Sequence, residues 1–424
     1  MKNYFKDYHG MTDPSCLLKF AWSTIRLYEK STNSCHRVKS DKLTIENFDD
    51  FHNTPLKLSA RQDMMDGKWP GGGCEYCQKI EEVNGISDRM IENTGRADMK
   101  RYIPIELQKN NRAVKVTPTI VEVYFNNLCN MSCIYCSADY STTWENENRK
   151  FNLVSNDEIT EYDKRKEEYP AILSRYWKWL EKNAPFIIEY NVLGGEPFFQ
   201  SELEQNIEFF ENNPCPNLIF TIFSNFKVAN SKFRKILDKV ENLVNNKCIK
   251  EFKIFASIDA WGPQEEYVRY GLNLIQWEEN YKTLVTDYPN IKLIIHSTMC
   301  NLNIKTVTGL IEKVNEGNEF RVKNSLPLIR FSCSLADGQT YLRSDIFPSG
   351  FFDNDFEKMI AITNDERTKL ILKGFKDTIN NQPYCPDLVE GLKLHLDDID
   401  KRRKLNWRSL FPWLDEFKIE LYAQ

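Results

Sequence analysis

The sequence lacks three features that would each place a protein in a broad class. It has no excess of cations, because 56 Lys and Arg residues face 61 Asp and Glu residues and leave a formal net charge of −5. Extended nucleic acid, whose phosphates attract a surplus of positive charge, is therefore not an expected partner. No apolar run approaches the ~18 residues that indicate a membrane span. The polar first residues, MKNYFKDYHGMTDPSC, are unlike a secretory signal, so we expect a cytoplasmic protein with no membrane partner.

Internal repeats and low-complexity linkers are lacking as well. The 424 residues are 41% hydrophobic and 13% aromatic, which is enough for a large core. The length is typical of one large domain plus a smaller one.

Cysteine, in contrast, is plentiful. The chain has 12 cysteines, and in a long chain without a secretory signal such residues more often bind metal or lie buried as thiols than form disulfides. Two groups stand apart: Cys16, Cys35, Cys74 and Cys77 near the start, then Cys129, Cys133 and Cys136. The others are scattered singly and are interpreted as small buried apolar residues: Cys215, Cys248, Cys300, Cys333 and Cys385.

Short apolar runs rich in β-branched and aromatic residues alternate with longer segments of helical periodicity. The runs are residues 119–125, 186–193, 218–224, 252–258, 291–299 and 328–335. This alternation predicts an α/β fold with a parallel sheet. Six strands are too few for a full eight-stranded barrel, so we expect a partial (β/α)6 TIM-like barrel.

The second cysteine group forms a C-x3-C-x2-C array just after the first predicted strand. A structural zinc site takes four protein ligands, whereas an iron–sulfur cube can be held by three cysteines with one iron left open. Parallel α/β sheets carry their chemistry beyond the carboxyl ends of the strands, where this array lies. An ordinary cluster or zinc site is the alternative.

This array, with Tyr135 just before its last cysteine, resembles the radical S-adenosylmethionine (SAM) superfamily. The resemblance implies that Cys129, Cys133 and Cys136 hold a [4Fe–4S] cluster whose open iron is chelated by the amino and carboxylate groups of SAM. It also implies that Tyr135 lies against the adenine; simple packing beside the cluster is the alternative.

The second predicted strand ends in LGGEPFF, with Gly194, Gly195, Glu196 and Pro197. Two glycines allow close backbone approach, and the carboxylate beside them can accept hydrogen bonds from an ammonium. In the resembled family this motif holds the SAM amino group. A plain turn is the alternative.

The fourth predicted strand ends in FASIDAW, where Ser257 and Asp259 alternate onto one face. The resemblance implies that they contact the ribose; a strand-end turn or a helix cap is the alternative. Arg269 follows and is expected at the SAM carboxylate, unless it is a solvated helix arginine. Two further pocket candidates, near the ends of the third and fifth predicted strands, are Asn225 and Asn303.

The first cysteine group pairs a C-x2-C knuckle at Cys74 and Cys77 with Cys16 and Cys35, which flank a segment that alternates like a hairpin. This arrangement resembles the twitch module, a shortened relative of the SPASM extension that carries one auxiliary [4Fe–4S] cluster. That module usually follows the barrel, whereas here it precedes it. Zinc bound by four cysteines is the alternative, and His36 could replace Cys35 as a ligand.

We therefore predict a twitch-like auxiliary-cluster module at 1–105, a radical SAM partial barrel at 106–345 and a helical region at 346–424 that closes the barrel. Residues 137–168 are expected to be a surface loop leading into a helix. The KRRK run at 401–404 could touch an acidic group, but a solvated helix face is favoured.

The resemblance implies reductive cleavage of SAM to a 5′-deoxyadenosyl radical, which abstracts hydrogen from a substrate carbon. The auxiliary cluster would accept an electron, and an external donor such as flavodoxin or ferredoxin would supply the first one. Enzymes with SPASM or twitch modules often modify ribosomally made peptides, so a peptide is the favoured substrate. The alternatives are a small metabolite or nucleotide derivative, or a non-catalytic iron–sulfur protein.

Overall fold

The computed structural model describes residues 13–83, 85–94, 98–336 and 338–418. The absence of a signal sequence was inferred largely from residues 1–12, which lie outside the described residues. The chain divides into two compact units. Unit 1 comprises Met1–Asn127, Val154–Ile222 and Asn242–Phe252, and unit 2 comprises Leu128–Leu153, Phe223–Glu241 and Lys253–Gln424.

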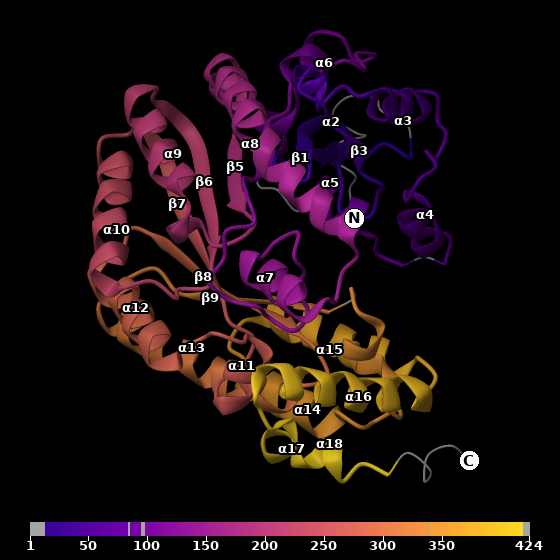
Figure 1. Cartoon of the computed structure of the whole chain (residues 1–424). Coiled ribbons are helices and arrows are strands. Elements are labelled where there is room, and N and C mark those ends of the chain that lie inside the picture. Colours follow the sequence, from indigo (N-terminus) through magenta and orange to yellow (C-terminus); the bar gives the residue numbers. More distant parts are fainter. Residues whose placement is uncertain (1–12, 84, 95–97, 337, 419–424) are drawn as a thin grey trace. The chain divides into compact units, whose positions relative to one another are not determined.

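All the strands predicted after residue 118 are present (Figure 1). They are β4 (Ile120–Tyr124), β5 (Glu189–Leu193), β6 (Cys215–Ser224), β7 (Ile249–Ser257), β8 (Lys292–Met299) and β9 (Arg330–Leu335). The pairs β4/β5, β5/β6, β7/β8 and β8/β9 are parallel. The predicted α/β class with a parallel arrangement is confirmed.

Unit 1 contains strands that the sequence did not predict as part of the sheet. After α2 (Leu17–Ala21) come β1 (Trp22–Arg26), β2 (Ser31–Asn33) and β3 (Asp41–Lys42). The β1/β2 pair is antiparallel, as the hairpin prediction requires, but β1 also pairs in parallel with β4. The strand order in unit 1 is therefore β3-β2-β1-β4-β5-β6, and the first cysteine group belongs to segments that extend the sheet.

The remaining helices of unit 1 lie between and after these strands. The α-helices are α3 (Pro55–Met65), α4 (Glu75–Glu82), α5 (Asp88–Thr94), α6 (Ile105–Lys109), α8 (Asn156–Asn183) and α9 (Ser201–Asn212). The 3-10 turns are η1 (Phe48–Asp50), η2 (Met99–Tyr102), η3 (Ala184–Phe186) and η4 (Pro197–Phe199). Helix α10 (Asn230–Asn245) contains the boundary between the units.

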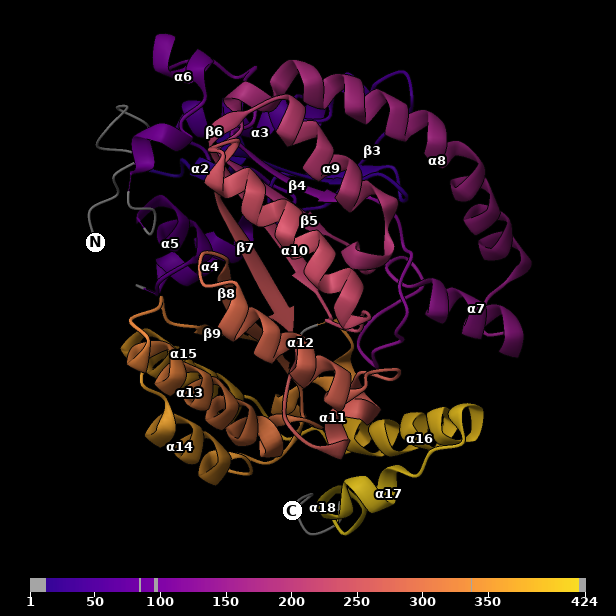
Figure 2. The same ribbon diagram turned by 90° about the vertical axis from the view of Figure 1, so that its left-hand side faces the viewer.

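In unit 2 the strand order is β7-β8-β9. Its α-helices are α7 (Thr142–Phe151), α11 (Pro263–Val268), α12 (Leu274–Asp287), α13 (Val307–Lys323), α14 (Asp353–Ile362), α15 (Glu366–Asn380), α16 (Pro386–Arg403), α17 (Trp407–Leu410) and α18 (Pro412–Asp415). The 3-10 turns are η5 (Ile304–Thr306), η6 (Thr340–Leu342) and η7 (Ser344–Ile346). Helices α13, α14 and α15 lie side by side (Figure 2). The helical character predicted for the C-terminal region is confirmed.

The expected surface loop at 137–168 was wrong, because α7 and the first half of α8 occupy it. Ser141 caps α7 by accepting a hydrogen bond from Trp144 N at 3.2 Å, and Asn152 ends it in the left-handed region at φ 51°. Ser155 and Glu158 then form a capping box that begins α8. These caps set the helix ends within a sequence whose polar composition resembles a loop.

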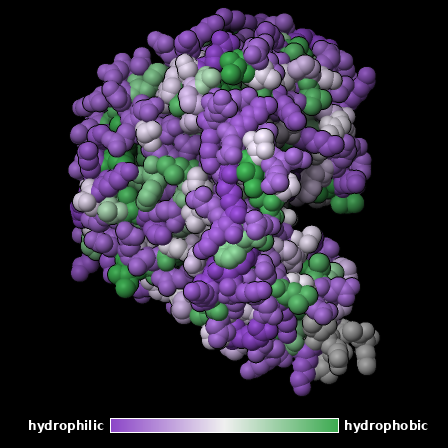
Figure 3. All heavy atoms as spheres, in the orientation of Figure 1, coloured by the Kyte–Doolittle hydropathy of each residue, from purple (hydrophilic) through white to green (hydrophobic). Residues whose placement is uncertain are grey.

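Within the part of the chain that the structure describes, every helix is too short or too polar to cross a membrane. On the face drawn in Figure 3, most of the surface is hydrophilic and apolar residues occur in small groups.

Candidate functional site

The cysteine loop, which we define as residues 128–141, lies in unit 2 and is held by backbone hydrogen bonds. Ser132 N donates to Tyr270 O at 2.9 Å, and Ile134 N donates to Val268 O at 2.8 Å. The two bonds hold the middle of the loop against the end of α11 and the residues that follow it. The two anchored residues, Ser132 and Ile134, adjoin Cys133 on either side.

Helix α7 supports the same loop from its other side. Thr142 exchanges hydrogen bonds with the backbone of Cys129, at 3.2 Å and 3.1 Å. Trp144 Nε1 donates to Cys133 O at 2.8 Å, and the Ser141 hydroxyl donates to Met131 O at 2.6 Å. None of these supporting residues was predicted from the sequence. The one signal was Ser141, a residue type that often caps a helix, three positions before Trp144.

The three thiols of the cysteine loop act on one another electrostatically. Burial, followed by the charges of Cys133 and Cys129, raises the pKa of Cys136. Burial also raises the pKa of Cys133, with the Arg269 charge opposing it. Three thiolates this close together in the sequence would need a cationic centre to balance their charge. The donor set fits an iron–sulfur cluster with one iron free of protein ligands.

Among the described residues, no three His, Cys, Asp or Glu side chains converge as they would around one metal ion. A cube of four irons holds its thiolates farther apart than a single zinc ion does. The two kinds of site therefore differ in the separation of the cysteine sulfurs that each requires.

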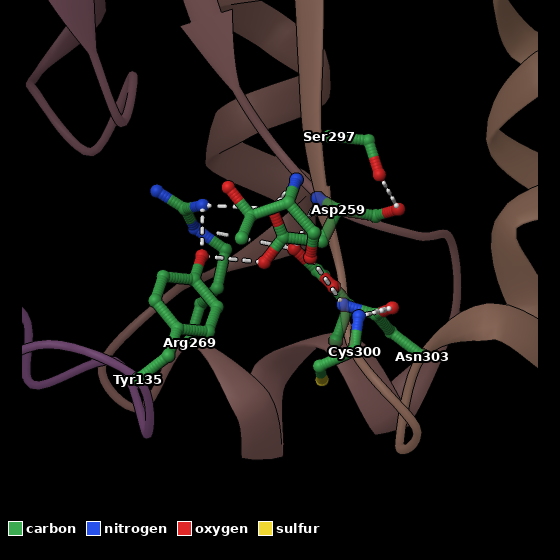
Figure 4. Close-up of polar contacts among 8 residues, drawn as sticks. Tyr135, Asp259, Arg269, Ser297, Cys300 and Asn303 are labelled. Carbon is green, nitrogen blue, oxygen red and sulfur yellow. Dashed lines mark hydrogen bonds and ion pairs between the residues drawn. The ribbon is translucent and has the colours of Figure 1, made fainter. Parts of the chain in front are cut away.

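Three predicted SAM-binding residues form a buried network with one another (Figure 4). Arg269 Nη1 donates to Tyr135 Oη at 2.6 Å and to Asp259 Oδ1 at 3.1 Å, and Tyr135 Oη donates to Asp259 Oδ2 at 2.5 Å. Asp259 is fully buried and Arg269 is 7% exposed. Arg269 is therefore not the solvated helix arginine of the alternative interpretation, and the network holds the Tyr135 side chain within the cysteine loop.

A residue missed in the sequence, Glu265, completes this network. Its Oε1 accepts a hydrogen bond from Asp259 N at 2.8 Å, and Oδ1 of Asp259 accepts another from Thr298 N at 2.9 Å. Burial, followed by the Asp259 charge, raises the pKa of Glu265 well above its usual range. Burial therefore favours the neutral form of Glu265, while Arg269 pairs with Asp259. The short E-E-x-x-R spacing was the only sequence signal for it.

The other predicted pocket residues of unit 2 have different environments. Asn225 Nδ2 lies 3.9 Å from Cys129 Sγ and donates to Asn130 Oδ1 at 3.1 Å, so it contacts the cysteine loop directly. Asn303 is fully buried and caps the turn after β8, where its Oδ1 accepts from Cys300 N at 2.8 Å. Ser257 is half-buried at the end of β7, in register with His296 of β8.

The Gly-Gly-Glu-Pro loop belongs to unit 1 and follows β5. Gly194 and Gly195 have φ values of 79° and 54°, in the left-handed region. A Cβ at Gly194 would lie 2.8 Å from Cδ1 of Tyr124, so a side chain cannot fit there. Backbone conformation and space both require glycine at Gly194.

Glu196 is only 1% exposed and is the N-cap of η4, which Pro197 begins. Its Oε1 accepts a hydrogen bond from Phe198 N at 3.1 Å. The carboxylate therefore caps a turn, as the alternative interpretation has it. The same negative charge at a strand end is what an ammonium requires, so the capping role and the ligand role remain compatible.

The first cysteine group, Cys16, Cys35, Cys74 and Cys77, lies within unit 1, where Cys16, Cys74 and Cys35 belong to or pack against one apolar cluster. Cys16 precedes α2, and Cys74 precedes α4, which contains Cys77. Burial, followed by the Cys35 charge, raises the pKa of Cys16 to about 12. Burial is also the main cause that raises the pKa of Cys35, with Cys77 and Cys74 adding to it.

A glycine makes this assembly possible. Gly73 has φ 125°, and a Cβ there would lie 2.2 Å from Arg37 O. The knuckle can therefore approach the segment after Cys35 only without a side chain at this position. Arg37 N in turn points at Cys35 Sγ at 3.4 Å. His36, the alternative ligand, instead contacts Glu122, with Nε2 and Oε1 3.4 Å apart.

The solvated-face interpretation of the KRRK run was wrong for Arg402 and Arg403, whose side chains are 7% and 2% exposed. Both pair with Glu147 of α7, at 2.7 Å and 3.0 Å. Arg403 also lies over the ring of Trp144, 4.6 Å from its centroid. The end of α16 therefore braces the helix that supports the cysteine loop.

Comparisons with known proteins give only distant structural likenesses. No protein-family model and no curated protein matches the chain. A structure of Streptococcus suis SuiB bound to S-adenosylmethionine aligns at 14% identity and TM-score 0.35, over 90% of this chain and 69% of that one. SuiB bound to its precursor peptide SuiA aligns at 13% identity and TM-score 0.34, over 96% and 77%. SuiB alone aligns at 14% and 0.35, over 93% and 74%. Likeness this distant says nothing of what this chain binds.

Proposed function

We propose that the protein is a radical SAM enzyme that carries an auxiliary cluster near its N-terminus. The observation that carries the proposal is the C-x3-C-x2-C array of the cysteine loop, which contains three cysteines and no fourth. The charges of Cys133 and Cys129 also act on the Cys136 thiol. When bound, the cluster and SAM supply reductive cleavage to methionine and a 5′-deoxyadenosyl radical, which abstracts hydrogen from a substrate carbon. The partial barrel, the module boundaries at 105 and 345 and barrel closure by the C-terminal helices belong to this proposal.

The chain's own residues have separate tasks in it. Cys129, Cys133 and Cys136 would ligate the cluster, and Asn225 would direct its amide at the Cys129 sulfur. Glu196 would accept hydrogen bonds from the SAM ammonium, on a backbone that Gly194 and Gly195 open to close approach.

The buried network of Tyr135, Asp259 and Arg269 suggests a specific task for each of the remaining residues that are predicted to bind SAM. Because both carboxylate oxygens of Asp259 already accept hydrogen bonds, a direct contact of Asp259 with the ribose requires exchange of one of them. Arg269 Nε, in contrast, has no hydrogen-bond partner among the described residues. The proposed task of Asp259 and Arg269 is first to hold Tyr135 in place beside the adenine site, and Ser257 is the stronger candidate for a ribose contact. Pro197 and Asn303 would shape the loops around it.

For the first cysteine group we propose an auxiliary [4Fe–4S] cluster bound by Cys16, Cys35, Cys74 and Cys77, with acceptance of a substrate electron as its role. A ribosomally made peptide is the proposed substrate class, on the resemblance to twitch-containing enzymes. A small metabolite or nucleotide derivative is the second candidate. Cytoplasmic location and a flavodoxin-like or ferredoxin-like electron donor complete the proposal.

Metal analysis and a cleavage assay test this function together. Anaerobically reconstituted protein should contain about eight irons and about eight sulfides if both sites hold four-iron clusters. With reductant and SAM it should release 5′-deoxyadenosine. About four irons with one zinc would keep the SAM assignment and overturn the auxiliary cluster. Iron without any SAM cleavage would favour the non-catalytic alternative.

Glu196→Ala should weaken SAM binding, because it removes a carboxylate that accepts charge-assisted hydrogen bonds worth about 1.5–3 kcal/mol. The SAM dissociation constant, measured by equilibrium binding, should rise roughly 10- to 100-fold while iron content is unchanged.

Glu196→Gln is the matched control, because an amide oxygen can still accept the hydrogen bond from Phe198 N. Its thermal stability should stay near that of the unmodified protein while its SAM affinity falls like that of Glu196→Ala. If Glu196→Gln binds SAM normally, the carboxylate only caps the turn.

A further inference from the structure

The turn that follows β6 is fastened to the cysteine loop at one residue. We define this β6 turn as residues 224–228, which lie in unit 2 together with the loop. Asn225 Nδ2 donates a hydrogen bond to Asn130 Oδ1 at 3.1 Å, and Lys227 Nζ donates to Asn130 O at 3.1 Å. In return, Asn130 Nδ2 donates to Lys227 O at 2.7 Å. Because Asn130 adjoins Cys129 in the sequence, the β6 turn is attached beside the first cysteine of the loop.

The side-chain amide of Asn225 has a partner for each of its polar atoms. Its Oδ1 accepts a hydrogen bond from Lys227 N at 2.8 Å, which identifies the oxygen end of the amide. The acceptors of Nδ2 are Asn130 Oδ1, at 3.1 Å, and the Cys129 sulfur, at 3.9 Å. The amide therefore presents an N–H to Cys129, as a thiolate requires.

The backbone of the β6 turn has an unfavourable conformation. Phe226 has φ 57°, in the left-handed region, where a bulky residue other than glycine is an outlier. Its side chain is fully buried, with its ring centroid 5.1 Å from that of Phe233 and 5.6 Å from that of Trp277. Such strain persists only where the surrounding structure determines the conformation.

Asn280 of α12 holds this strained turn. It is fully buried, and its Nδ2 donates hydrogen bonds to Phe226 O at 2.9 Å and to Val228 O at 2.8 Å. Its Oδ1 accepts from Asn230 Nδ2 at 2.9 Å, so the orientation of the amide is fixed. Without Asn280, two buried carbonyl groups would each lose a donor in a turn that is already strained.

A glycine leaves room for the attachment of the turn to the loop. Gly271 has φ 100°, and a Cβ there would lie 3.2 Å from Asn130 O and 3.3 Å from Lys227 Nζ. A side chain at this position would therefore press against both atoms of the lysine contact.

We infer that Asn280 is a positioning residue for the cysteine loop: by holding the β6 turn, it keeps the Asn225 amide directed at the Cys129 sulfur. Where that sulfur binds a cluster, the hydrogen bond stabilises negative charge, which is greater after reduction. The β6 turn therefore raises the reduction potential of the cluster. This effect rests on the proposed function, whereas the attachment of Asn280, the turn and the loop to one another does not.

A potentiometric titration followed by EPR tests the inference on the cluster whose signal responds to SAM. Asn225→Leu removes the donor with little change in size, and the ratio of reduced to oxidised cluster at a fixed potential should fall about fivefold. Asn280→Ala should lower the ratio in the same direction, because the amide is no longer held. The double variant should show no larger fall than Asn225→Leu alone, since Asn280 acts through Asn225.

Asn318→Ala is the matched control. Asn318 forms two hydrogen bonds with the backbone of Ile329, at 3.0 and 2.8 Å, and has none with the cysteine loop among the described residues. Its variant should give the same ratio as the unmodified protein. An unchanged ratio in Asn225→Leu, or a further fall in the double variant, overturns the inference.

Hydrogen exchange of the metal-free protein tests the role of Asn280 without a cluster. In Asn280→Ala the backbone amides of residues 128–136 should exchange faster than in Asn318→Ala, because the loop loses its attachment. Should Asn280→Ala fail to fold, Asn280→Ser, whose hydroxyl can still donate one hydrogen bond, gives the same comparison with a smaller effect. If the reconstituted protein binds no iron, the proposed function fails and the exchange rates alone decide. Equal exchange of this segment in the Asn280 and Asn318 variants overturns the inference.

Discussion

Simultaneous replacement of Cys129, Cys133 and Cys136 by alanine should abolish 5′-deoxyadenosine formation and remove about half of the bound iron. The proposed cluster loses every protein ligand, whereas the first cysteine group keeps all of its thiols in unit 1. Iron and sulfide analysis after anaerobic reconstitution, with a cleavage assay in excess reductant, measures both effects. The remaining cluster should keep an EPR signal that SAM does not alter.

Alanine at Cys215, Cys248 and Cys385 provides the matched control, because it removes the same number of thiols from singly placed cysteines. That variant should retain its full iron content and its cleavage activity. Cleavage that survives in the cysteine-loop variant would overturn the SAM assignment. Loss of all iron from that variant would show that the two cysteine groups do not bind metal independently.

Asp259→Ala should destabilise the protein by about 3–5 kcal/mol, because it leaves the buried Arg269 guanidinium without its counter-charge. It also removes the acceptor of the Tyr135 hydroxyl, at 2.5 Å, and of Thr298 N, at 2.9 Å. Denaturant unfolding of the metal-free protein, followed by circular dichroism, gives the shift in the free energy of unfolding.

Two further variants isolate the cause. Asp259→Ala combined with Arg269→Met removes both charges and should recover part of the lost stability, since the two residues are in contact. Asp287→Ala breaks the Arg234–Asp287 pair, whose side chains are 43% and 41% exposed, and should cost about 0–1 kcal/mol. If Asp259→Ala costs no more than Asp287→Ala, the network contributes nothing specific to stability.

Strands were the part of the fold that the sequence predicted best, since short apolar runs rich in β-branched and aromatic residues, such as FKIFASI, strongly favour a buried strand. The pairing of β1 with β4 was not predicted, although the hairpin that contains β1 was. Its WSTIR segment is polar, and its buried Thr24 is satisfied by Glu122, which lies 98 residues away. Only the folded chain supplies that partner, so propensity alone favoured a local hairpin.

The two cysteine groups could be recognised because their spacing is visible in the sequence, and their role as metal ligands stays a prediction. The partners of charged residues could not be recognised. Asp259 and Arg269 were expected to face a ligand, and no sequence pattern indicated that they also bind each other. Likewise, nothing in the sequence around Lys19 marks it as buried. Such pairings depend on which charges the tertiary structure excludes from water, and sequence patterns do not contain this information.

The contact between α16 and α7 has a consequence for biosynthesis. Arg402 follows Glu147 by 255 residues, so the ribosome releases the cysteine loop long before the arginines that brace its supporting helix. A nascent chain therefore exposes its thiols while Trp144 and Glu147 still lack their cationic partners. The ion pairs that stabilise α7 can therefore form only near the end of translation. A chain that stopped before Arg402 would contain all the cysteines of the loop but would lack these ion pairs.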